Sequence, residues 1–414
     1  MKRIVLVVFI VASMGLLVSP VWAETLQGAL KNGAVNGELK YMYVDANDTD
    51  VKLAKGIDDK TSHASSIHLN YLSGDFYGFT AGVSFEGSHD FTSNSDTPEP
   101  RLGFSDTLLS QIYLDYKFDK TDVKVGRQYI ATPLIKNTRG WAMYDSFDGV
   151  VVTSKYFADT VLMAMYIKDW NTSWSNIEDV HFEDPVMSFY ASNKSIKGLK
   201  LMGQFMTTDN EGNNGDIPAK TIDGYETYFA QGDYKLPVKF PVTVSLQAGG
   251  ASFDRDAEDD SNFYGLKLAT KVSGIKLAVA YTSVAEDNDF AGTLGHVCNP
   301  MFNHMLINSS LFAGLETLSL SAGYDFSKIG IKGLNVRMMM ASFSQSDDGM
   351  DNSVRNMDGA QEIDLDVKYA FSGALKGLSA RIWAGYADHD LDVDNINSGE
   401  NEIEYVRFFV NYKF

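Results

Sequence analysis

The chain has 414 residues, of which 44% are hydrophobic and 12% aromatic, and its formal net charge at pH 7 is −19. This acidic balance excludes a protein that binds nucleic acid through a basic face, and a single cysteine, Cys298, excludes an intramolecular disulfide. The length fits two or three soluble domains or one long barrel.

The first 23 residues have the pattern of a secretory signal peptide. Lys2 and Arg3 precede an apolar run over 4–18, and residues 21–23, VWA, place small side chains where a signal peptidase reads. We therefore expect cleavage after Ala23. The alternative is an N-terminal membrane anchor, but the apolar run is too short to span a membrane comfortably. No later stretch approaches about 18 consecutive apolar residues, so we expect an exported chain without a spanning helix.

Eighteen segments of the mature chain, most of them about 9–12 residues long, have the alternating pattern of β-strands that cross a membrane. Residues 111–118, QIYLDYKF, alternate polar and apolar side chains, and residues 361–369, QEIDLDVKY, do the same. Because Asp and Glu are poor strand formers, charges at every second position indicate a wet face. Alternation alone does not say whether that face lines a barrel or covers a soluble sandwich.

The lengths of the connections separate these two cases. Short connections, such as 119–120, 194–198 and 272–274, alternate along the chain with long ones. Outer-membrane barrels have short periplasmic turns, long outer loops and an even number of strands. The sequence therefore predicts an all-β fold, one transmembrane antiparallel β-barrel over 24–414 with 18 strands, 16 being possible. The long connections include 45–61, 88–107, 131–146, 169–185 and 287–315.

The end of the chain resembles the signal by which barrel-assembly machinery recognises its clients. Val406, Phe408, Val410, Tyr412 and Phe414 share one face of the last strand, and the chain stops on Phe414. We expect Tyr412 and Phe414 to form this signal, and the assembly machinery to be a partner of the chain.

Residues 126–152, GRQYIATPLIKNTRGWAMYDSFDGVVV, interrupt the alternation. We expect the part over 131–146, the third outer loop, to fold into the barrel and narrow its pore. A barrel of 16–18 strands leaves an aqueous channel, and charges that line a narrow part select ions. The alternative is that these charges are solvated on an outer loop. The predicted basic side is Lys136 and Arg139, and the predicted acidic side is Asp145 and Asp148 with Asp115 on the wall.

Arg127 has two interpretations. Strict alternation from Val123 and Val125 places it on the lipid face, at the rim of the membrane. A β-bulge at Gly126 would instead turn its side chain into the pore. We favour the bulge, which adds Arg127 to the constriction.

Arg337, Arg381 and Arg407 lie on the parity of their strands that points away from lipid. They could line the pore wall as a basic track for anionic groups. Equally, they could pair with inward carboxylates and stiffen the barrel.

Four runs in and beside the segment 126–152 carry a family resemblance. They are Lys124-Val125-Gly126-Arg127-Gln128, Thr132-Pro133-Leu134, Asn137-Thr138-Arg139 and Phe147-Asp148-Gly149-Val150. Together they resemble the corresponding region of the OprD-like outer-membrane porins. The resemblance implies an 18-stranded barrel, often trimeric, whose third outer loop folds inward.

Cofactor and catalytic patterns are weak. The acidic segments 254–260 and 388–402 could bind Ca²⁺ or Mg²⁺ that bridge to lipopolysaccharide, because hard cations prefer oxygen ligands. A solvated acidic surface is the favoured reading, so no cofactor is expected. His296, Cys298 and His304 are close in sequence but give only a weak metal signal. Without a phosphate loop, dinucleotide fingerprint or compelling catalytic triad, we expect no enzyme.

The sequence thus predicts an outer-membrane porin through which ions and small hydrophilic solutes diffuse passively. We expect mild cation selectivity, because acid-rich vestibules concentrate cations. The alternative within this class is a porin that prefers organic anions or amino acids. Alternatives from other classes are a barrel enzyme and a sleeve for another protein. Besides the assembly machinery, the expected partners are outer-membrane lipid, lipopolysaccharide, small solutes and two further copies in a homotrimer.

Overall fold

The structure, a computed structural model, describes residues 25–48, 60–92, 102, 105–137, 139–172, 179–209, 224–253, 259–295, 298–353, 355–391 and 399–414. The predicted signal peptide lies outside these ranges. Within them, no helix is both long enough and apolar enough to cross a membrane.

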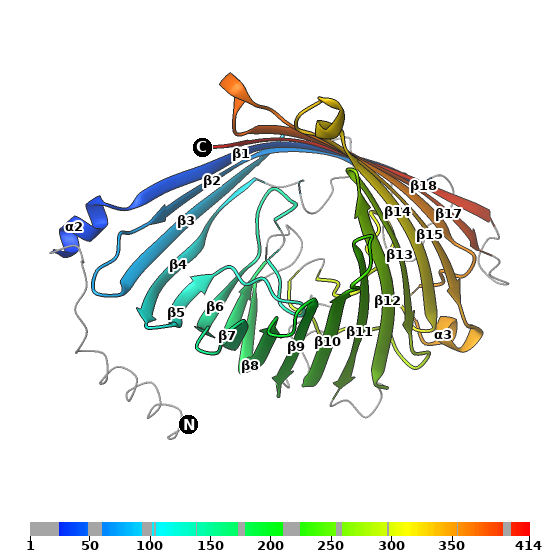
Figure 1. Cartoon of the computed structure of the whole chain (residues 1–414), viewed down its shortest axis with the longest axis horizontal. Coiled ribbons are helices and arrows are strands. Elements are labelled where there is room, and N and C mark those ends of the chain that lie inside the picture. The colour runs from blue at the N-terminus through cyan, green and yellow to red at the C-terminus, as the bar shows by residue number, and fades with distance from the viewer. Residues whose placement is uncertain are drawn as a thin grey trace.

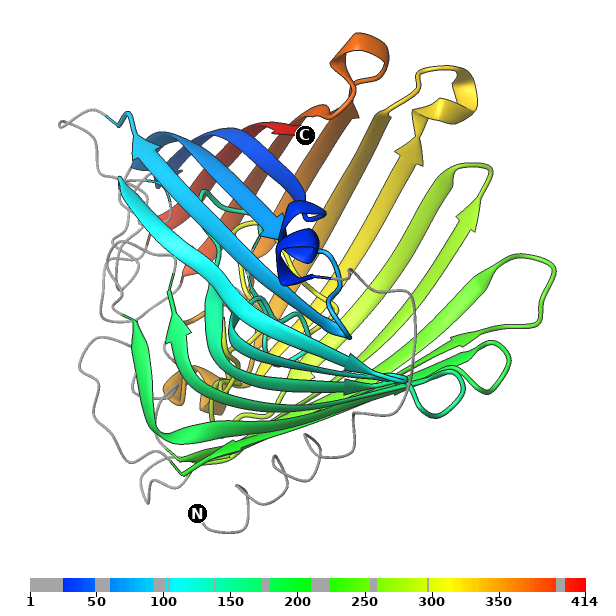
Figure 2. The same ribbon diagram turned by 90° about the vertical axis from the view of Figure 1, so that its left-hand side faces the viewer.

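Eighteen antiparallel strands follow one another around a single closed sheet (Figures 1 and 2), which confirms the predicted fold and strand number. β1 (Ala34–Asp48) pairs with β18 (Gly399–Lys413) and closes the barrel. The remaining strands are β2 (Lys60–Leu72), β3 (Phe79–Asp90), β4 (Asp106–Phe118), β5 (Thr121–Gln128), β6 (Ser146–Ser154), β7 (Thr160–Asn171), β8 (Val180–Asn193), β9 (Leu199–Thr208), β10 (Tyr225–Lys235), β11 (Val242–Phe253), β12 (Ser261–Val272), β13 (Ile275–Val284), β14 (Leu315–Asp325), β15 (Leu334–Gln345), β16 (Gln361–Ala370) and β17 (Leu378–Leu391).

Alternation along each strand decides which side chains meet lipid. On β16, Ile363 and Leu365 are exposed on the outside of the barrel, whereas Glu362 and Asp364 are buried inside it. A closed antiparallel sheet satisfies its backbone hydrogen bonds between strands, which a membrane requires. The apolar parity can therefore face lipid while the polar parity faces the lumen.

The connections form two sets at opposite ends of the barrel. At one end, here the turn end, eight connections cover 73–78, 119–120, 155–159, 194–198, 236–241, 273–274, 326–333 and 371–377. The other end, here the loop end, carries the remaining nine, among them 129–145 and 285–314. Short turns mark the periplasmic side of an outer-membrane barrel.

The connection between β7 and β8 is shorter than the predicted 169–185, because the strands extend to Asn171 and from Val180. Pro185 is tolerated inside β8 because it lies in a register shift, where Ile167 pairs with Val186 and Asp169 with His181. Proline has no N–H to donate, so such irregular positions suit it.

Four short helices complete the described chain. α2 (Leu26–Lys31) precedes β1, and α3 (Asp347–Asp351) lies between β15 and β16. Two single-turn helices, η2 (Phe326–Ile329) and η3 (Gly373–Leu375), lie in the connections at the turn end. The C-terminus is also at this end, where the backbones of Phe414 and Gly37 exchange two hydrogen bonds.

Candidate pore constriction

Two loops of the loop end fold into the barrel and meet there. We call residues 129–145 loop 3 and residues 285–314 loop 7. The Lys136 N–H donates to the Leu294 carbonyl at 2.9 Å, and the Leu294 N–H donates to the Leu134 carbonyl at 2.9 Å. Gly295 is required beside this contact, because a Cβ there would lie 1.9 Å from the Lys136 carbonyl oxygen. The inward fold of loop 3 was predicted, whereas that of loop 7 was not.

Apolar packing fixes one side of loop 3. Leu134, Ile135 and Leu294 have no exposed surface, and they pack against inward side chains of the wall from β6 to β12, such as Phe147 and Ile167. Fully burying an aliphatic side chain contributes about 1.5–3 kcal/mol. The contact between the two loops is therefore a small hydrophobic core inside the barrel.

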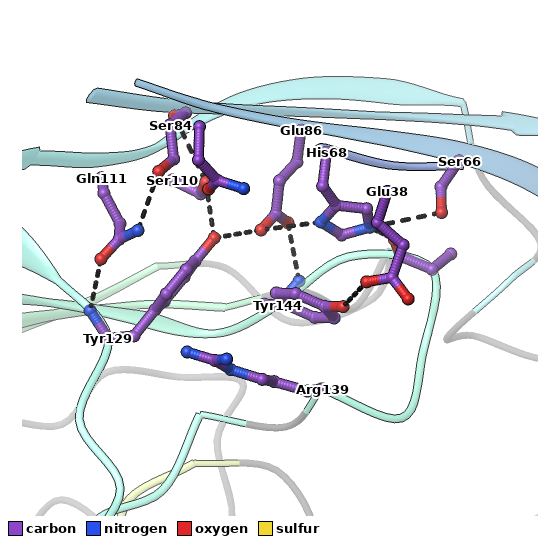
Figure 3. A network of polar contacts seen from close by, with 12 residues as sticks. Glu38, Ser66, His68, Ser84, Glu86, Ser110, Gln111, Tyr129, Arg139 and Tyr144 are labelled. Carbon is purple, nitrogen blue, oxygen red and sulfur yellow. Dashed lines mark hydrogen bonds and ion pairs between the residues drawn. The ribbon is translucent and has the colours of Figure 1, made fainter. Parts of the chain in front are cut away.

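A buried polar network fixes the other side of loop 3 (Figure 3). Glu86 of β3, 2% exposed, accepts hydrogen bonds from the Tyr144 N–H at 2.8 Å and from the Tyr129 hydroxyl. The His68 ring of β2 bridges to the loop, with Nδ1 3.1 Å from a Glu86 oxygen and Nε2 2.8 Å from the Ala142 carbonyl oxygen. A buried carboxylate is costly unless such donors surround it.

Lys40 of β1 completes this anchor. Its ammonium donates to the Trp141 carbonyl at 3.0 Å, the Tyr144 hydroxyl at 2.5 Å and the Arg139 carbonyl at 3.3 Å. The Tyr144 hydroxyl in turn donates to Glu38 at 2.9 Å. Residues 139–144 are thus held against β1–β3 by the side chains of Lys40, His68 and Glu86, which we call the polar anchor.

Wall carboxylates hold loop 7 in a similar way. Asp364 accepts from the Leu306 N–H at 3.0 Å. Glu362 accepts from the Ile307 N–H at 2.8 Å and the Asn308 N–H at 2.9 Å. Both acids point inward from β16, accept hydrogen bonds from the backbone of loop 7 and are buried, so they do not line the open pore.

Cations remain exposed at the constriction. Lys136 and Arg139, both predicted for its basic side, are exposed on loop 3. The Arg139 guanidinium lies 5.3 Å from the centre of the Tyr129 ring, on the side away from the strands (Figure 3). Cation–π contact favours this position. The Tyr129 hydroxyl is itself bound to Glu86 and to Ser110.

Arg407 of β18 adds a third cation from the wall. Its guanidinium lies 3.9 Å from the centre of the Trp141 ring and donates to the Tyr405 hydroxyl at 3.0 Å. The pKa of His304, in loop 7, depends on the positive charges near the constriction. Its pKa is lowered to about 4, chiefly because the surrounding protein desolvates the ring and then because of the positive charges of Lys136, Arg407 and Arg337. The imidazole is therefore neutral at neutral pH.

The predicted acidic side does not form. Asp145 has no exposed surface, so its carboxylate does not face the open lumen. Asp115 is on the inward face of β4, 8% exposed, opposite Lys124 of β5 near the turn end. Asp148 is paired with Arg127.

The preferred interpretation of Arg127 is wrong. Both sheet neighbours of β5 pair through Gly126 without a register shift, although Gly126 has φ +121°. Arg127 therefore keeps the outward parity of Val125 and lies opposite the exposed Ile112. Its guanidinium binds both oxygens of Asp148 at 2.8 and 3.0 Å. The pair is on the outer face of the barrel, outside the constriction.

Arg337 and Arg381 point into the lumen nearer the turn end. Arg381 binds both oxygens of Asp366 at 2.6 and 2.9 Å, and Arg337 lies 3.8 Å from the same carboxylate. Pairing with an inward acid is thus seen for both. The same wall borders a cavity of about 1020 Å³, in which basic side chains outnumber acidic ones. The charged residues that line it are Lys235, Lys267, Lys271, Lys276, Arg337, Lys368 and Arg381, with Asp366.

The weak metal pattern finds no support among the described residues, which contain no group of three or more His, Cys, Asp or Glu side chains able to hold a metal ion. Burial raises the pKa of the Cys298 thiol to about 12, and its Sγ lies 3.4 Å from the Pro133 carbonyl oxygen. His296 lies outside the described residues. So do most of the acidic segment 254–260 and residues 392–398 of the second one, so divalent cation binding there stays a prediction.

Sequence reasoning missed the polar anchor and loop 7. The inward parity of His68 was visible, but Glu86 and Lys40 carry no motif. Phe290 and Leu294 were the available signal for loop 7, because apolar side chains in a long outer loop need a core to enter, and both are buried.

Solved structures of other proteins share the fold of this chain. The structure of OccK9 (OpdG) from Pseudomonas aeruginosa superimposes with a TM-score of 0.74 at 17% identity, over 93% of this chain and 99% of that one. OccD3 (OpdP) from the same organism gives 0.73 at 15% identity, over 95% and 94%. At such identities the likeness shows the shared fold.

Comparison with the curated proteins gave no match. The family described as outer membrane porin, OprD family, matches residues 75–414, which is most of the chain. The protein therefore belongs to the OprD family: it is a porin of the outer membrane and not an enzyme.

Proposed function

We propose that the protein is a passive diffusion pore that favours small solutes carrying an anionic group. One observation carries this proposal: the constriction exposes cations, while the nearby carboxylates are bound to loop backbone. Lys136 and Arg139 are exposed, whereas Glu86, Glu362 and Asp364 are at most 3% exposed. Charge of one sign at a narrow passage selects ions of the other sign.

Net charge points the other way, but it counts every charged group of the chain and not only those at the constriction. The seven loop-end connections other than loops 3 and 7 contain 22 acidic and 6 basic residues. Screening reduces the influence of exposed charges beyond about 8 Å at physiological ionic strength. We therefore expect the constriction to outweigh the outer loops, and the mild cation selectivity predicted from composition is the competing outcome.

Solutes diffuse through the pore down their own concentration gradients and need no energy source. The loops that narrow the pore are part of the barrel and are fixed by its own wall.

The predicted homotrimer also remains a proposal, supported by the resemblance to a family that is often trimeric. Measuring the mass of the folded protein in detergent tests it, and a monomer would contradict it.

The decisive experiment is the reversal potential of the reconstituted protein in a planar bilayer across a salt gradient. We expect anion preference in the wild type, and a shift towards cations in Arg139→Ala and Lys136→Ala. Arg127→Gln is the matched control, because it removes a guanidinium from the outer face and should leave selectivity unchanged. A cation-selective wild type would contradict the anion preference, and folded protein without conductance would contradict the open pore.

A further inference from the structure

The turn end of the barrel has a charge opposite to that of the chain. The eight turns contain eight lysines, three aspartates and no arginine or glutamate. All residues of these turns are described, so the count is complete for this end. All eight lysines are exposed. They are Lys120, Lys155, Lys194, Lys197, Lys239, Lys328, Lys332 and Lys376.

Exposed apolar side chains accompany the lysines in the same turns. Phe157 is 62% exposed beside Lys155, Phe240 is 59% exposed beside Lys239, and Ile329 is 62% exposed beside Lys328. Large apolar side chains exposed to this degree are unfavourable in water, but they suit the boundary between headgroups and acyl chains. The turns therefore have the composition of a membrane interface and not only that of a solvated charged surface.

The lysines extend around the barrel instead of gathering on one side. Six of the eight turns carry at least one, from the turn after β4 to the turn after β16. Neighbouring turns are also in contact. The Lys155 N–H donates to the Lys120 carbonyl at 2.8 Å, and the Lys120 ammonium lies 5.9 Å from the centre of the Tyr156 ring. A single protein docked to the barrel would cover one arc, whereas this arrangement fits a partner that surrounds it.

We propose that these turns form a collar that binds the anionic headgroups of phospholipids in the periplasmic leaflet. The apolar side chains enter the acyl boundary, and the lysines extend from it to phosphate groups, as long basic side chains do at membrane surfaces. The attraction of basic groups to an anionic leaflet amounts to about 1 kcal/mol per residue. The loop end contains 26 acidic and 8 basic residues, so the two ends of the barrel carry opposite charge.

The test compares lipid retention by the wild type with that of K155Q/K197Q/K239Q/K332Q. Each protein is reconstituted in nanodiscs of equal parts phosphatidylcholine and phosphatidylglycerol, and the lipids that stay bound after release are counted by native mass spectrometry. We expect the wild type to retain phosphatidylglycerol preferentially, and the variant to lose most of this preference. One lysine can change the partition of an anionic headgroup by up to about fivefold.

Two controls make the outcome specific. The corresponding variant with four arginines keeps the charge and should retain the preference, and 1 M salt should abolish it in the wild type. If the fourfold glutamine variant does not fold, K197Q/K332Q replaces it, with roughly half the loss expected. Equal retention of both lipids by the wild type, or the same preference in the glutamine variant, would overturn the proposal. The pore measurements are independent, because none of these lysines lies at the constriction.

Discussion

The two sides of loop 3 are fixed by different chemistry. Residues 139–144 are held by hydrogen bonds to the polar anchor, whereas residues 134–136 are held by aliphatic packing and two backbone hydrogen bonds to loop 7. Hydrogen bonds are directional, so the polar side sets where Tyr129 and Arg139 lie. Apolar burial is not directional, so the other side supplies stability with less control over the pore charge.

Removing the polar anchor should have the largest effect. Glu86→Ala leaves the Tyr144 N–H and the Tyr129 hydroxyl without their shared acceptor and removes the carboxylate that lies 3.1 Å from His68 Nδ1. Leaving a buried hydrogen-bond donor without its acceptor costs about 1–3 kcal/mol, and the loss of two such bonds is enough to release this side of loop 3. We expect larger single-channel conductance and weaker anion preference. Glu86→Gln is the control, since its amide oxygen still accepts from Tyr144, and unaltered conductance in the alanine variant would refute this role.

Weakening the apolar side should reduce stability with little change in selectivity. Leu134→Ala removes a fully buried side chain, and such changes cost about 2–5 kcal/mol. We expect unfolding at a lower temperature in a heat-modifiability assay, with the reversal potential of the wild type. Leu201→Ala is a matched control, because Leu201 is 45% exposed on the outer face of β9. A shift in selectivity as large as that of Glu86→Ala would show that both sides control the pore charge.

Gly295→Ala tests the contact between the two loops. Gly295 has φ +102°, and its new Cβ would collide with the Lys136 carbonyl. Strain of this kind costs of order 1–3 kcal/mol, so we expect the loops to separate locally and channel noise to increase. Gly140→Ala, in loop 3, is the control: its new Cβ meets no atom within 4 Å, so the variant should behave as wild type. Current noise at the wild-type level in the Gly295 variant would argue that the positions of the loops do not depend on this contact.

The smallest expected effect concerns pH. The pKa of His304 is lowered to about 4, so the ring is neutral at pH 7 and gains a proton only as the pH falls towards 4. The added positive charge should then strengthen anion preference. Reversal potentials between pH 7 and pH 4, compared with those of His304→Gln, check this. An identical pH profile in the variant would assign the effect to another group.

The sequence predicts the barrel well because alternation and connection length are local properties that a membrane enforces along the whole chain. Lys136 and Arg139 were also predictable, since they lie in the segment that interrupts the alternation. Arg127 was not, because a positive φ at Gly126 does not by itself shift the register of β5. The burial of the inward acids Glu86, Glu362 and Asp364 could not be predicted either. Their partners include backbone N–H groups of a distant loop, and backbone N–H groups leave no pattern in a sequence.

The anchoring of loop 7 has a consequence for how the pore can evolve. Glu362 and Asp364 bind the backbone of residues 306–308 and not their side chains. Every residue except proline supplies the same N–H. The side chain of Ile307, which is partly exposed, can therefore be exchanged while the attachment persists, whereas those of Leu306 and Asn308 are buried. Divergent relatives could therefore acquire new linings by substitution in the loop alone, without rebuilding the wall that supports it.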